Sequence, residues 1–314
     1  MFFEGSEKKF EVVVDSHVEP LRQRPRKFWE LLVKCSNAEI IGELKSSSCT
    51  AYLLSESSLF VWDDRITMIT CGETTLANAV EFFINEVGPD HTQMLIFQRK
   101  NEFQSHLQKS SFFDDEDRLK KLMPGNSFCF GKRHEHHNLL FASHKEFLPP
   151  ENDNTLELLM YDIDPQLLEV LTDPGTCLET TREILQLHTI LREFELDDFC
   201  FEPFGYSLNA LRGDTYATIH ITPQKQSSYI SYETNADLKE SQKMLGHFLE
   251  VLRPGTFDLI QFNSDGENLV PQDYSLRTCT QKVLDCGYEV AFFHYFHKNT
   301  IVNEALELNK KEWL

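Results

Sequence analysis

The sequence lacks long apolar runs, paired cysteines and an excess of basic residues, and each absence excludes a class of protein. No window approaches the roughly 18–20 apolar residues that cross a bilayer. The first residues lack the basic-then-apolar order of a signal peptide, so we expect a soluble, cytoplasmic protein that does not act at a membrane. The eight cysteines are scattered with no CxxC pair, which predicts free thiols rather than a disulfide framework or a zinc ribbon.

Basic residues are too few for a nucleic-acid binder. The chain of 314 residues has 30 Lys and Arg against 50 Asp and Glu, a formal charge of −20. Phosphate binding depends on Lys and Arg that release counterions, so this charge argues against nucleic acid and favours a cationic ligand or partner. With 41% hydrophobic residues, a sizeable core is available.

The periodicity mixes strands and amphipathic helices without strict alternation. We expect strands at 9–14, 51–61, 65–70, 93–99, 126–131, 138–142, 156–162, 198–203, 206–211, 215–221, 227–233, 257–263 and 287–296. We expect helices at 74–87, 165–172, 180–193 and 236–252. The pattern predicts an α+β fold with two antiparallel sheets face to face and helices outside. One domain, 1–314, would contain two similar halves, about 1–148 and 149–314, joined through 145–155, although no sequence repeat is visible.

The segment Leu54-Ser55-Glu56-Ser57-Ser58 places four polar residues inside an otherwise apolar strand. One interpretation is a bulge or an edge-strand kink whose hydroxyls bond nearby backbone groups. The other is a reactive serine held on a rigid strand.

A second candidate pairs Ser207 with His220. If 206–211 and 215–221 form a hairpin around Gly213, the two side chains approach each other across the ladder. A serine hydrolase is one hypothesis, but the segment lacks the last glycine and the strand–turn–helix context of a nucleophile elbow. A hydrogen-bonded structural histidine is the other.

Three weaker signals remain. Cys71 lies at a strand end before a helix, where its thiol pKa could be lowered, although most free cysteines are small buried hydrophobes. Carboxylates occur inside strand-like runs, where they must be paired or hold a cation unless that face is solvated; they are Glu4, Glu7, Glu11, Asp153, Glu157 and Glu233. The run 134–137 (HEHH) has the composition of a metal tract, but its place in an expected turn favours a solvated loop.

Together these blocks resemble the eukaryotic S-adenosylmethionine decarboxylases, pyruvoyl-dependent enzymes of polyamine synthesis, over most of the chain. The resemblance rests on 2–8 (FFEGSEK), 54–61 (LSESSLFV), 70–72 (TCG), 99–101 (RKN), 155–160 (TLELLM), 201–207 (FEPFGYS), 218–223 (TIHITP) and 232–235 (YETN). It implies a four-layer α/β-β/α sandwich. It also implies a proenzyme that cuts itself between Glu56 and Ser57 into a β chain, 1–56, and an α chain, 57–314.

For the chemistry, the resemblance implies a covalent pyruvoyl group derived from Ser57 and no metal. The Ser57 hydroxyl would attack the preceding carbonyl, and local strain would favour this acyl shift. His220 would be the base of the elimination that follows, and Ser207 would support the intermediate. The pyruvoyl group would form a Schiff base with S-adenosylmethionine and accept the electrons released with CO2. Cys71 would then donate a proton to the product.

The resemblance also assigns binding residues. Glu4 and Glu7 would lie near the amino acid and sulfonium parts of the substrate, Phe3 and Phe201 would sandwich adenine, and position 224 would hold the ribose. A buried acidic cluster would bind putrescine as an activator; its matching residues are Glu11, Arg99, Asp153, Thr155, Glu157 and Glu233. Whether the chain forms a homodimer, a heterodimer or neither stays open.

Four positions depart from the family pattern. A glutamate is replaced by Gln224, which weakens the hydrogen bonds expected to the ribose. A lysine two residues before the cysteine is replaced by Ile69, and a cysteine by Phe204. Glu73 stands where the family has threonine, and its charge would raise the pKa of Cys71. These changes leave open a second hypothesis, a weakly active paralogue that regulates an active decarboxylase.

Overall fold

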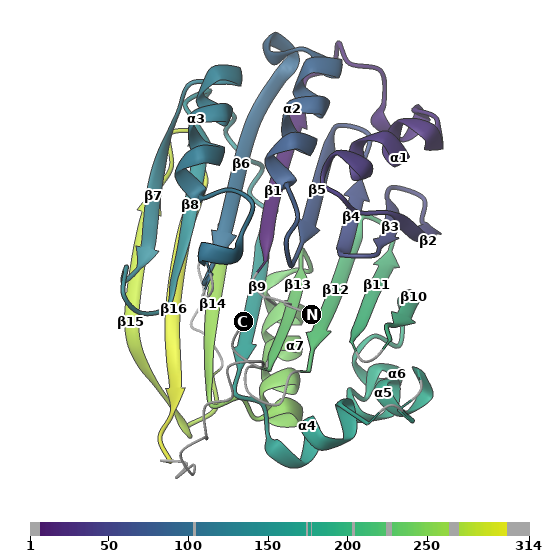
Figure 1. Cartoon of the computed structure of the whole chain (residues 1–314), viewed down its shortest axis with the longest axis vertical. Helices are drawn as coiled ribbons and strands as arrows, with labels where there is room; N and C mark the ends of the chain where they lie inside the picture. Colours follow the sequence, from purple (N-terminus) through teal and green to yellow (C-terminus); the bar gives the residue numbers. More distant parts are fainter. Residues whose placement is uncertain are drawn as a thin grey trace.

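Two eight-stranded antiparallel sheets stack to form the molecule (Figure 1). The computed structural model describes residues 7–102, 105–173, 175–176, 178–202, 205–223, 228–263 and 270–299. The first sheet comprises β1 (Lys8–Val14), β2 (Ile40–Lys45), β3 (Thr50–Leu54), β4 (Ser57–Val61), β5 (Arg65–Thr70), β6 (Thr92–Lys100), β7 (Gly125–Gly131) and β8 (His137–Ser143). The second comprises β9 (Thr155–Tyr161), β10 (Glu195–Cys200), β11 (Tyr206–Arg212), β12 (Thr215–Thr222), β13 (Tyr229–Thr234), β14 (Thr256–Phe262), β15 (Tyr274–Val283) and β16 (Glu289–His297).

Helices cover the outer faces of both sheets. They are α1 (Arg26–Cys35), α2 (Leu76–Val87), α3 (Phe112–Leu122), α4 (Pro165–Leu171), α5 (Leu178–Ile184), α6 (Leu187–Ile190) and α7 (Leu238–Leu252), with short 3-10 turns η1 (Leu21–Gln23), η2 (Pro89–His91) and η3 (Ser105–Leu107). Figure 1 shows α1–α3 with the first sheet and α4–α7 with the second. The predicted α+β sandwich is confirmed. None of the described helices is long and apolar enough to cross a membrane.

The two sheets have the same topology. The strand order is β2-β3-β4-β5-β1-β6-β8-β7 in the first and β10-β11-β12-β13-β9-β14-β16-β15 in the second. Adding eight to each strand number converts one order into the other. Each half of the chain therefore builds one sheet, and the repeat that the sequence conceals is present in the fold.

Alternation along the strands separates an outer apolar face from a mixed inner face. Phe10 and Val12 of β1 pack in the core beneath α1–α3. Leu156 and Leu158 of β9 pack in the matching core of the second sheet. The intervening positions face the other sheet, and there Lys9 and Glu157 meet. Because strand side chains alternate between faces, one short sequence supplies both an apolar core and a buried polar layer.

Several elements differ from the sequence-based expectation. The segment 51–61 is not one interrupted strand but a hairpin, since β3 and β4 pair antiparallel with Leu54 opposite Ser57. The helix expected at 180–193 is divided into α5 and α6, and Gln186 between them has a left-handed backbone, which ends a helix. The strand expected at 198–203 lies at 195–200 as β10. No sequence signal was found for α1, α3, β2 or β15.

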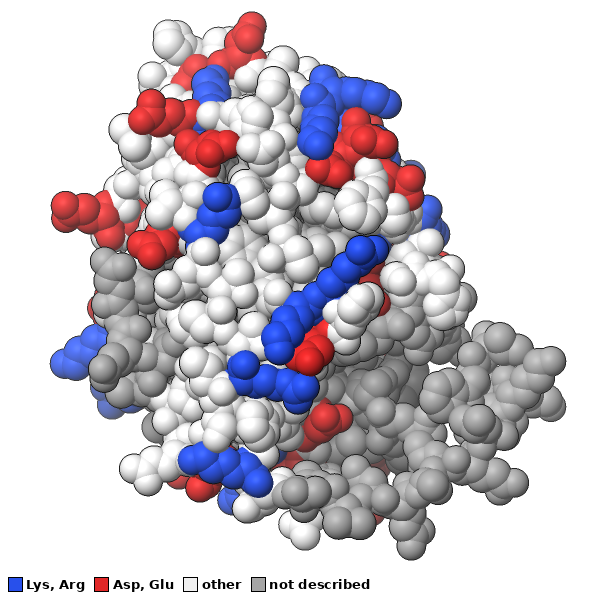
Figure 2. Space-filling model, turned by 90° about the vertical axis from the view of Figure 1, so that its left-hand side faces the viewer, with Lys and Arg blue, Asp and Glu red and all other residues white. Residues whose placement is uncertain are grey.

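The acidic excess does not give every face one sign of charge. Figure 2 shows the side of the molecule at the left of Figure 1, where β7 and β15 lie, with Lys and Arg side chains among the Asp and Glu side chains. One pair of opposite charges involves β15 itself, where Arg277 lies 3.1 Å from Glu135.

Candidate active site

The turn between β3 and β4 holds Ser57 in an unfavourable backbone conformation. Its φ is +141°, a region that residues with a Cβ rarely adopt. The side chain is buried, and its Oγ has no hydrogen-bond partner among the described residues. A buried hydroxyl without a partner beside a strained peptide is costly, and such costs occur at functional sites. The kink predicted for this segment is therefore present as a hairpin turn, whereas the reactive serine stays a prediction.

Cys71 holds the carbonyl group that precedes Ser57. The Glu56 oxygen accepts a hydrogen bond from the Cys71 backbone N–H at 3.0 Å and from its thiol at 3.3 Å. The β4–β5 ladder brings the two segments together, since Ser57 lies opposite Thr70. The chain turns at Gly72, with a positive φ, and Lys8 Nζ donates to the Gly72 carbonyl at 2.8 Å. Two donors thus face one peptide oxygen, as in an oxyanion hole.

The surroundings of Cys71 keep its thiol protonated. Burial raises the pKa of Cys71, and the Glu56 and Glu7 carboxylates raise the pKa further. From the sequence, the Glu73 charge was expected to raise the pKa of Cys71. The Glu73 side chain is exposed, however, and the carboxylates that raise the pKa of the thiol are those of Glu56 and Glu7. The expectation that the following helix lowers the pKa of the Cys71 thiol is therefore wrong. A thiol of this kind can donate a proton but is a poor nucleophile.

Ser207 and His220 lie opposite each other in the β11–β12 ladder. His220 Nδ1 is 3.0 Å from Ser207 Oγ, as the hairpin predicted from sequence requires. The other ring nitrogen, Nε2, is 2.9 Å from Thr218 Oγ1 and 3.3 Å from Ser58 Oγ, next to Ser57 in the chain. Burial lowers the pKa of His220 to about 4. The imidazole is therefore neutral near pH 7 and can accept a proton.

Glu7 connects the first sheet with the strand beside His220. Its carboxylate accepts a hydrogen bond from Ser231, which lies opposite His220 in the β12–β13 ladder. Lys100 Nζ contacts the other carboxylate oxygen at 3.2 Å. Glu7 is almost fully buried. Among the other predicted site residues, Phe3, Glu4 and Gln224 lie outside the described residues, as does Phe204.

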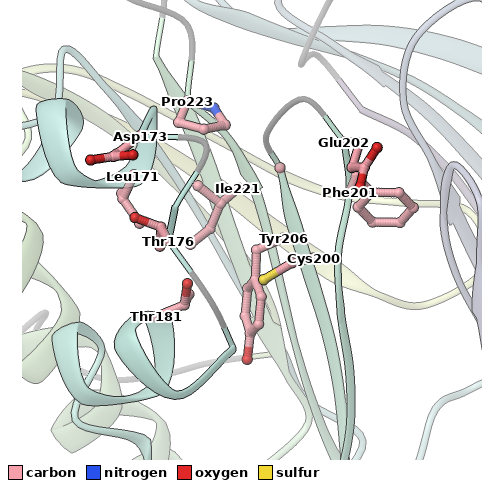
Figure 3. Close-up of a pocket in the computed structure, with 11 residues that line it drawn as sticks. Leu171, Asp173, Thr176, Thr181, Cys200, Phe201, Glu202, Tyr206, Ile221 and Pro223 are labelled. Atoms are coloured by element: carbon pink, nitrogen blue, oxygen red, sulfur yellow. The ribbon is translucent and has the colours of Figure 1, made fainter.

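Phe201 lines a cavity of about 190 Å³ at the end of β10, together with Tyr206, Thr181 and Pro223. Its ring contacts Phe199 edge-on, with ring centroids 5.0 Å apart. In Figure 3, Phe201 and Glu202 are set apart from the threonines and Asp173 on the other side of the strands. Phe201 therefore lies at the margin of this cavity rather than at its centre.

The predicted acidic cluster is buried between the sheets and contains its own cations. Lys9 Nζ lies 2.8 Å from Glu157 and 2.7 Å from Glu233. Lys100 Nζ lies 2.9 Å from the other oxygen of Glu157 and also contacts Glu7. These contacts form one chain of alternating charges, from Glu233 through Lys9, Glu157 and Lys100 to Glu7.

Arg65 neutralises the remaining part of the cluster. Its guanidinium contacts Glu11 at 3.0 Å and Asp153 at 2.5 Å, and the Tyr288 hydroxyl also donates to Asp153. Thr155, at the start of β9, is buried two residues before Glu157. The cluster therefore contains five carboxylates and three cationic side chains. Burial raises the pKa of Glu11 and of Glu233.

Arg99 belongs to a different group of charges. Its guanidinium contacts Glu102 at 2.5 Å and Asp115 of α3 at 2.8 Å, on the helix-covered side of the first sheet. The reason is strand alternation, since Arg99 lies opposite Lys8 rather than Lys9 in the β1–β6 ladder. The cationic partners that the structure gives to the acidic cluster are Lys9, Lys100 and Arg65, which the sequence analysis did not select.

Lys9 lies beside position 69, where Ile69 replaces the lysine of the family pattern. In the β1–β5 ladder, Lys9 lies directly opposite Ile69. The ammonium group expected from β5 is therefore supplied by the adjacent strand. The signal that could have shown this was the alternation Glu7, Lys9, Glu11, which places three charges on one face of a buried strand.

Comparisons with known proteins agree with this geometry. The family profile described as adenosylmethionine decarboxylase matches residues 1–307. An S-adenosylmethionine decarboxylase proenzyme from Trypanosoma cruzi is 33% identical, with 96% of this chain and 85% of that protein covered. One from Xenopus laevis is 31% identical, covering 90% and 88%. A solved AdoMetDC-delta26 monomer from Trypanosoma brucei superposes with a TM-score of 0.60 at 28% identity, covering 77% of this chain and 99% of that one. The chain belongs to the adenosylmethionine decarboxylase family.

Proposed function

We propose that this chain is a proenzyme that cuts its own backbone between Glu56 and Ser57 and then decarboxylates S-adenosylmethionine. The observation that carries the proposal is the Glu56 carbonyl, held by two hydrogen bonds from Cys71 beside a strained serine. The hydroxyl of this serine is buried and has no hydrogen-bond partner within the part of the chain that the structure describes. Family membership supports the same reaction class.

Self-processing follows from the chemistry of these groups. Ser57 Oγ attacks the Glu56 carbonyl carbon, and the Cys71 donors stabilise the negative charge that develops on the oxygen. The Glu56–Ser57 C–N bond then breaks, which leaves an ester on Oγ and a free amine on Ser57. Neutral His220 removes the Ser57 Cα proton, the Cβ–Oγ bond breaks, and residues 1–56 leave with a terminal carboxylate. Hydrolysis of the resulting dehydroalanine releases ammonia and leaves a pyruvoyl group on residues 57–314.

The residues present fit a pyruvoyl group at position 57. That position is buried, it adjoins the Ser58 hydroxyl near His220, and the Cys71 thiol donates to the carbonyl that precedes it. The group supplies a ketone carbonyl that condenses with the substrate amine and accepts electrons as CO2 leaves. Cys71 then donates its proton to the substrate carbon, a role suited to a thiol whose pKa is raised by burial. Glu7 provides negative charge for a cationic substrate.

Substrate contacts at Phe3, Glu4, Phe201 and Gln224 remain proposals by family resemblance, and three of these positions lie outside the described residues. Cytoplasmic location and a homodimeric or heterodimeric state also stay predictions.

We further propose that the protein does not require putrescine. Each predicted diamine-site carboxylate already has a cationic partner. Lys9 contacts Glu157 and Glu233, Lys100 contacts Glu157, and Arg65 contacts Glu11 and Asp153. Two ammonium groups fixed in the fold have the charge of one bound diamine. No translational and rotational freedom of a separate ligand is then lost, because the cations are part of the chain.

Release of labelled CO2 from carboxyl-labelled S-adenosylmethionine tests both statements. The purified chain should release CO2, Ser57→Ala should not, and Ser55→Ala in the same turn should retain activity. Putrescine should change the wild-type rate less than twofold. Activity that survives in Ser57→Ala would refute the enzyme mechanism, whereas activity that depends on putrescine would refute only the diamine proposal.

The two rival hypotheses gain less support. A Ser207 hydrolase would need an acid to orient His220, but the described partners of its second ring nitrogen are the Thr218 and Ser58 hydroxyls. A weakly active paralogue that regulates an active decarboxylase would not need the Cys71 contacts with the Glu56 carbonyl.

A further inference from the structure

A second buried cluster of chemically active side chains lies away from the Ser57 turn. Asp258 of β14 and His294 of β16 face each other in the second sheet, where they are partners in the ladder. His136 reaches them from the β7–β8 connection of the first sheet. This histidine belongs to the run that sequence analysis expected to be a solvated loop. That expectation holds for His134, which is exposed, but not for His136, whose side chain is 18% exposed.

The two histidines present the same ring atom to one carboxylate. His136 Nδ1 is 2.9 Å from Asp258 Oδ2, and His294 Nδ1 is 2.8 Å from Asp258 Oδ1. Their rings stack with centroids 4.1 Å apart. Tyr161 packs edge-on against His136 at 4.7 Å, and Asn101 Nδ2 donates to Asp258 at 2.5 Å. Neighbouring side chains therefore fix the orientation of all three groups.

Asp258 lies completely buried between the two histidines. His294 is buried as well, whereas the His136 side chain is 18% exposed, so among the described residues the cluster is reached from the His136 side. The result is a carboxylate between two imidazoles, with an approach from one side.

We propose that His136, Asp258 and His294 bind a divalent transition-metal ion of the zinc type. One ligand atom from each residue lies within 4.8 Å of the other two. Zinc bonds to nitrogen and carboxylate oxygen of about 2.0–2.2 Å place neighbouring ligand atoms roughly 3 Å apart, close to the present Nδ1–O distances. With the ring protons on Nε2, both Nδ1 lone pairs would coordinate the ion, which would replace the two Nδ1–carboxylate hydrogen bonds. Two imidazoles and one carboxylate favour zinc, cobalt or nickel over magnesium or calcium.

An ion at this place would join the two sheets. His136 belongs to the first half of the chain, whereas Asp258 and His294 belong to the second. Tyr161 packs edge-on against His136, and its ring lies 5.4 Å from that of Tyr229. The inferred role is a structural clamp between the two sheets rather than a reacting centre.

Titration of the chelator-treated, full-length chain with Co²⁺ tests the inference. We expect one ion per chain, d–d absorption without a sulfur-to-cobalt charge-transfer band, and displacement by Zn²⁺. A ligand that binds the folded state should also raise the melting temperature. His136→Ala, whose side chain reaches solvent, should lower the affinity at least tenfold, as should Asp258→Asn. His134→Ala in the same loop should bind like the wild type.

Three results would overturn the proposal. The first is a triad that binds no cobalt at any concentration that the folded protein tolerates, which would leave a purely hydrogen-bonded cluster. The second is a sulfur charge-transfer band, which would place the ion on a cysteine. The third is binding lost in His91→Ala but kept in His136→Ala, because Asp15, His17 and His91 form a more exposed group of possible ligands.

Discussion

Replacement of Lys9 by methionine is the perturbation that most sharply probes the charges between the sheets. Methionine keeps most of the side-chain volume but removes the ammonium group that contacts Glu157 and Glu233. Both carboxylates are almost fully buried, and among the residues that the structure describes Glu157 would retain only Lys100 as a cationic partner. The variant therefore leaves uncompensated negative charge in the interior.

The size of the effect follows from this burial. Removing one partner of a buried ion pair costs about 3–5 kcal/mol, since the other charge stays desolvated. Burial lowers the pKa of Lys9, but Glu157 and Glu233 raise it more, so the net folded-state pKa lies above the ordinary value of 10.5. A raised pKa contributes stability that is complete below 10.5 and lost as the pH rises through the folded-state value. At pH 7.5 the full loss should be measured.

Urea unfolding at pH 7.5 measures this loss. A Ser57→Ala background keeps the chain in one piece, so that the folded and unfolded states are the same molecule. Lys120→Met is the matched control, because the Lys120 side chain is 46% exposed where it pairs with Glu116 on α3, so its loss should change the unfolding free energy by less than about 1 kcal/mol. Putrescine at about 100 times its dissociation constant should restore roughly 2.7 kcal/mol to Lys9→Met and little to the wild type.

Two outcomes would refute this reasoning. If Lys9→Met unfolds with the wild-type free energy, the ammonium group does not compensate the buried carboxylates. If the variant is destabilised but no diamine restores it, the cluster is an ion-pair network that cannot accept a diamine in place of Lys9.

Three further predictions concern individual site residues. Burial lowers the pKa of His220 to about 4, so the rate of self-cleavage should show no inflection near pH 6.5 and should fall only as the pH approaches 4; a half-maximal rate at pH 6.5, followed by gel time course, would contradict this. Cys71→Ala keeps the backbone N–H on the Glu56 carbonyl but loses the weaker thiol donor, so cleavage should slow by about tenfold and decarboxylation should fall further, whereas the partly buried Cys35→Ala should do neither. Arg99→Met should lower the unfolding free energy by about 3 kcal/mol through loss of Glu102 and Asp115, yet leave the response to putrescine unchanged; a new diamine requirement would return Arg99 to the acidic cluster.

Sequence patterns predicted the layers of the fold better than its turns. Apolar alternation and helical spacing were sufficient for most strands and for α2 and α7, because these elements bury one face. The β3–β4 hairpin was missed because Ser55 and Glu56 are not the Asn-Gly or Gly-containing pair that marks a two-residue turn. The strain that a favourable turn would avoid is instead present at Ser57.

The candidate site was predicted in part. Ser207 and His220 could be placed together from the short connection between two strands, since register fixes which residues meet. The pairing of Lys9 with Glu157 could not, because it joins different sheets and depends on how they stack. Arg99 was wrongly assigned for a related reason. Its position matches the family motif, but the pleat of the strand turns its side chain away from the acidic cluster.

The most direct test of the account is the intact mass of the purified wild-type chain. The account predicts two polypeptides, residues 1–56 with a free carboxylate and residues 57–314 with a pyruvoyl group in place of the serine amino terminus. A single uncut chain of 36.6 kDa, one oxygen atom heavier than the Ser57→Ala variant, would contradict it.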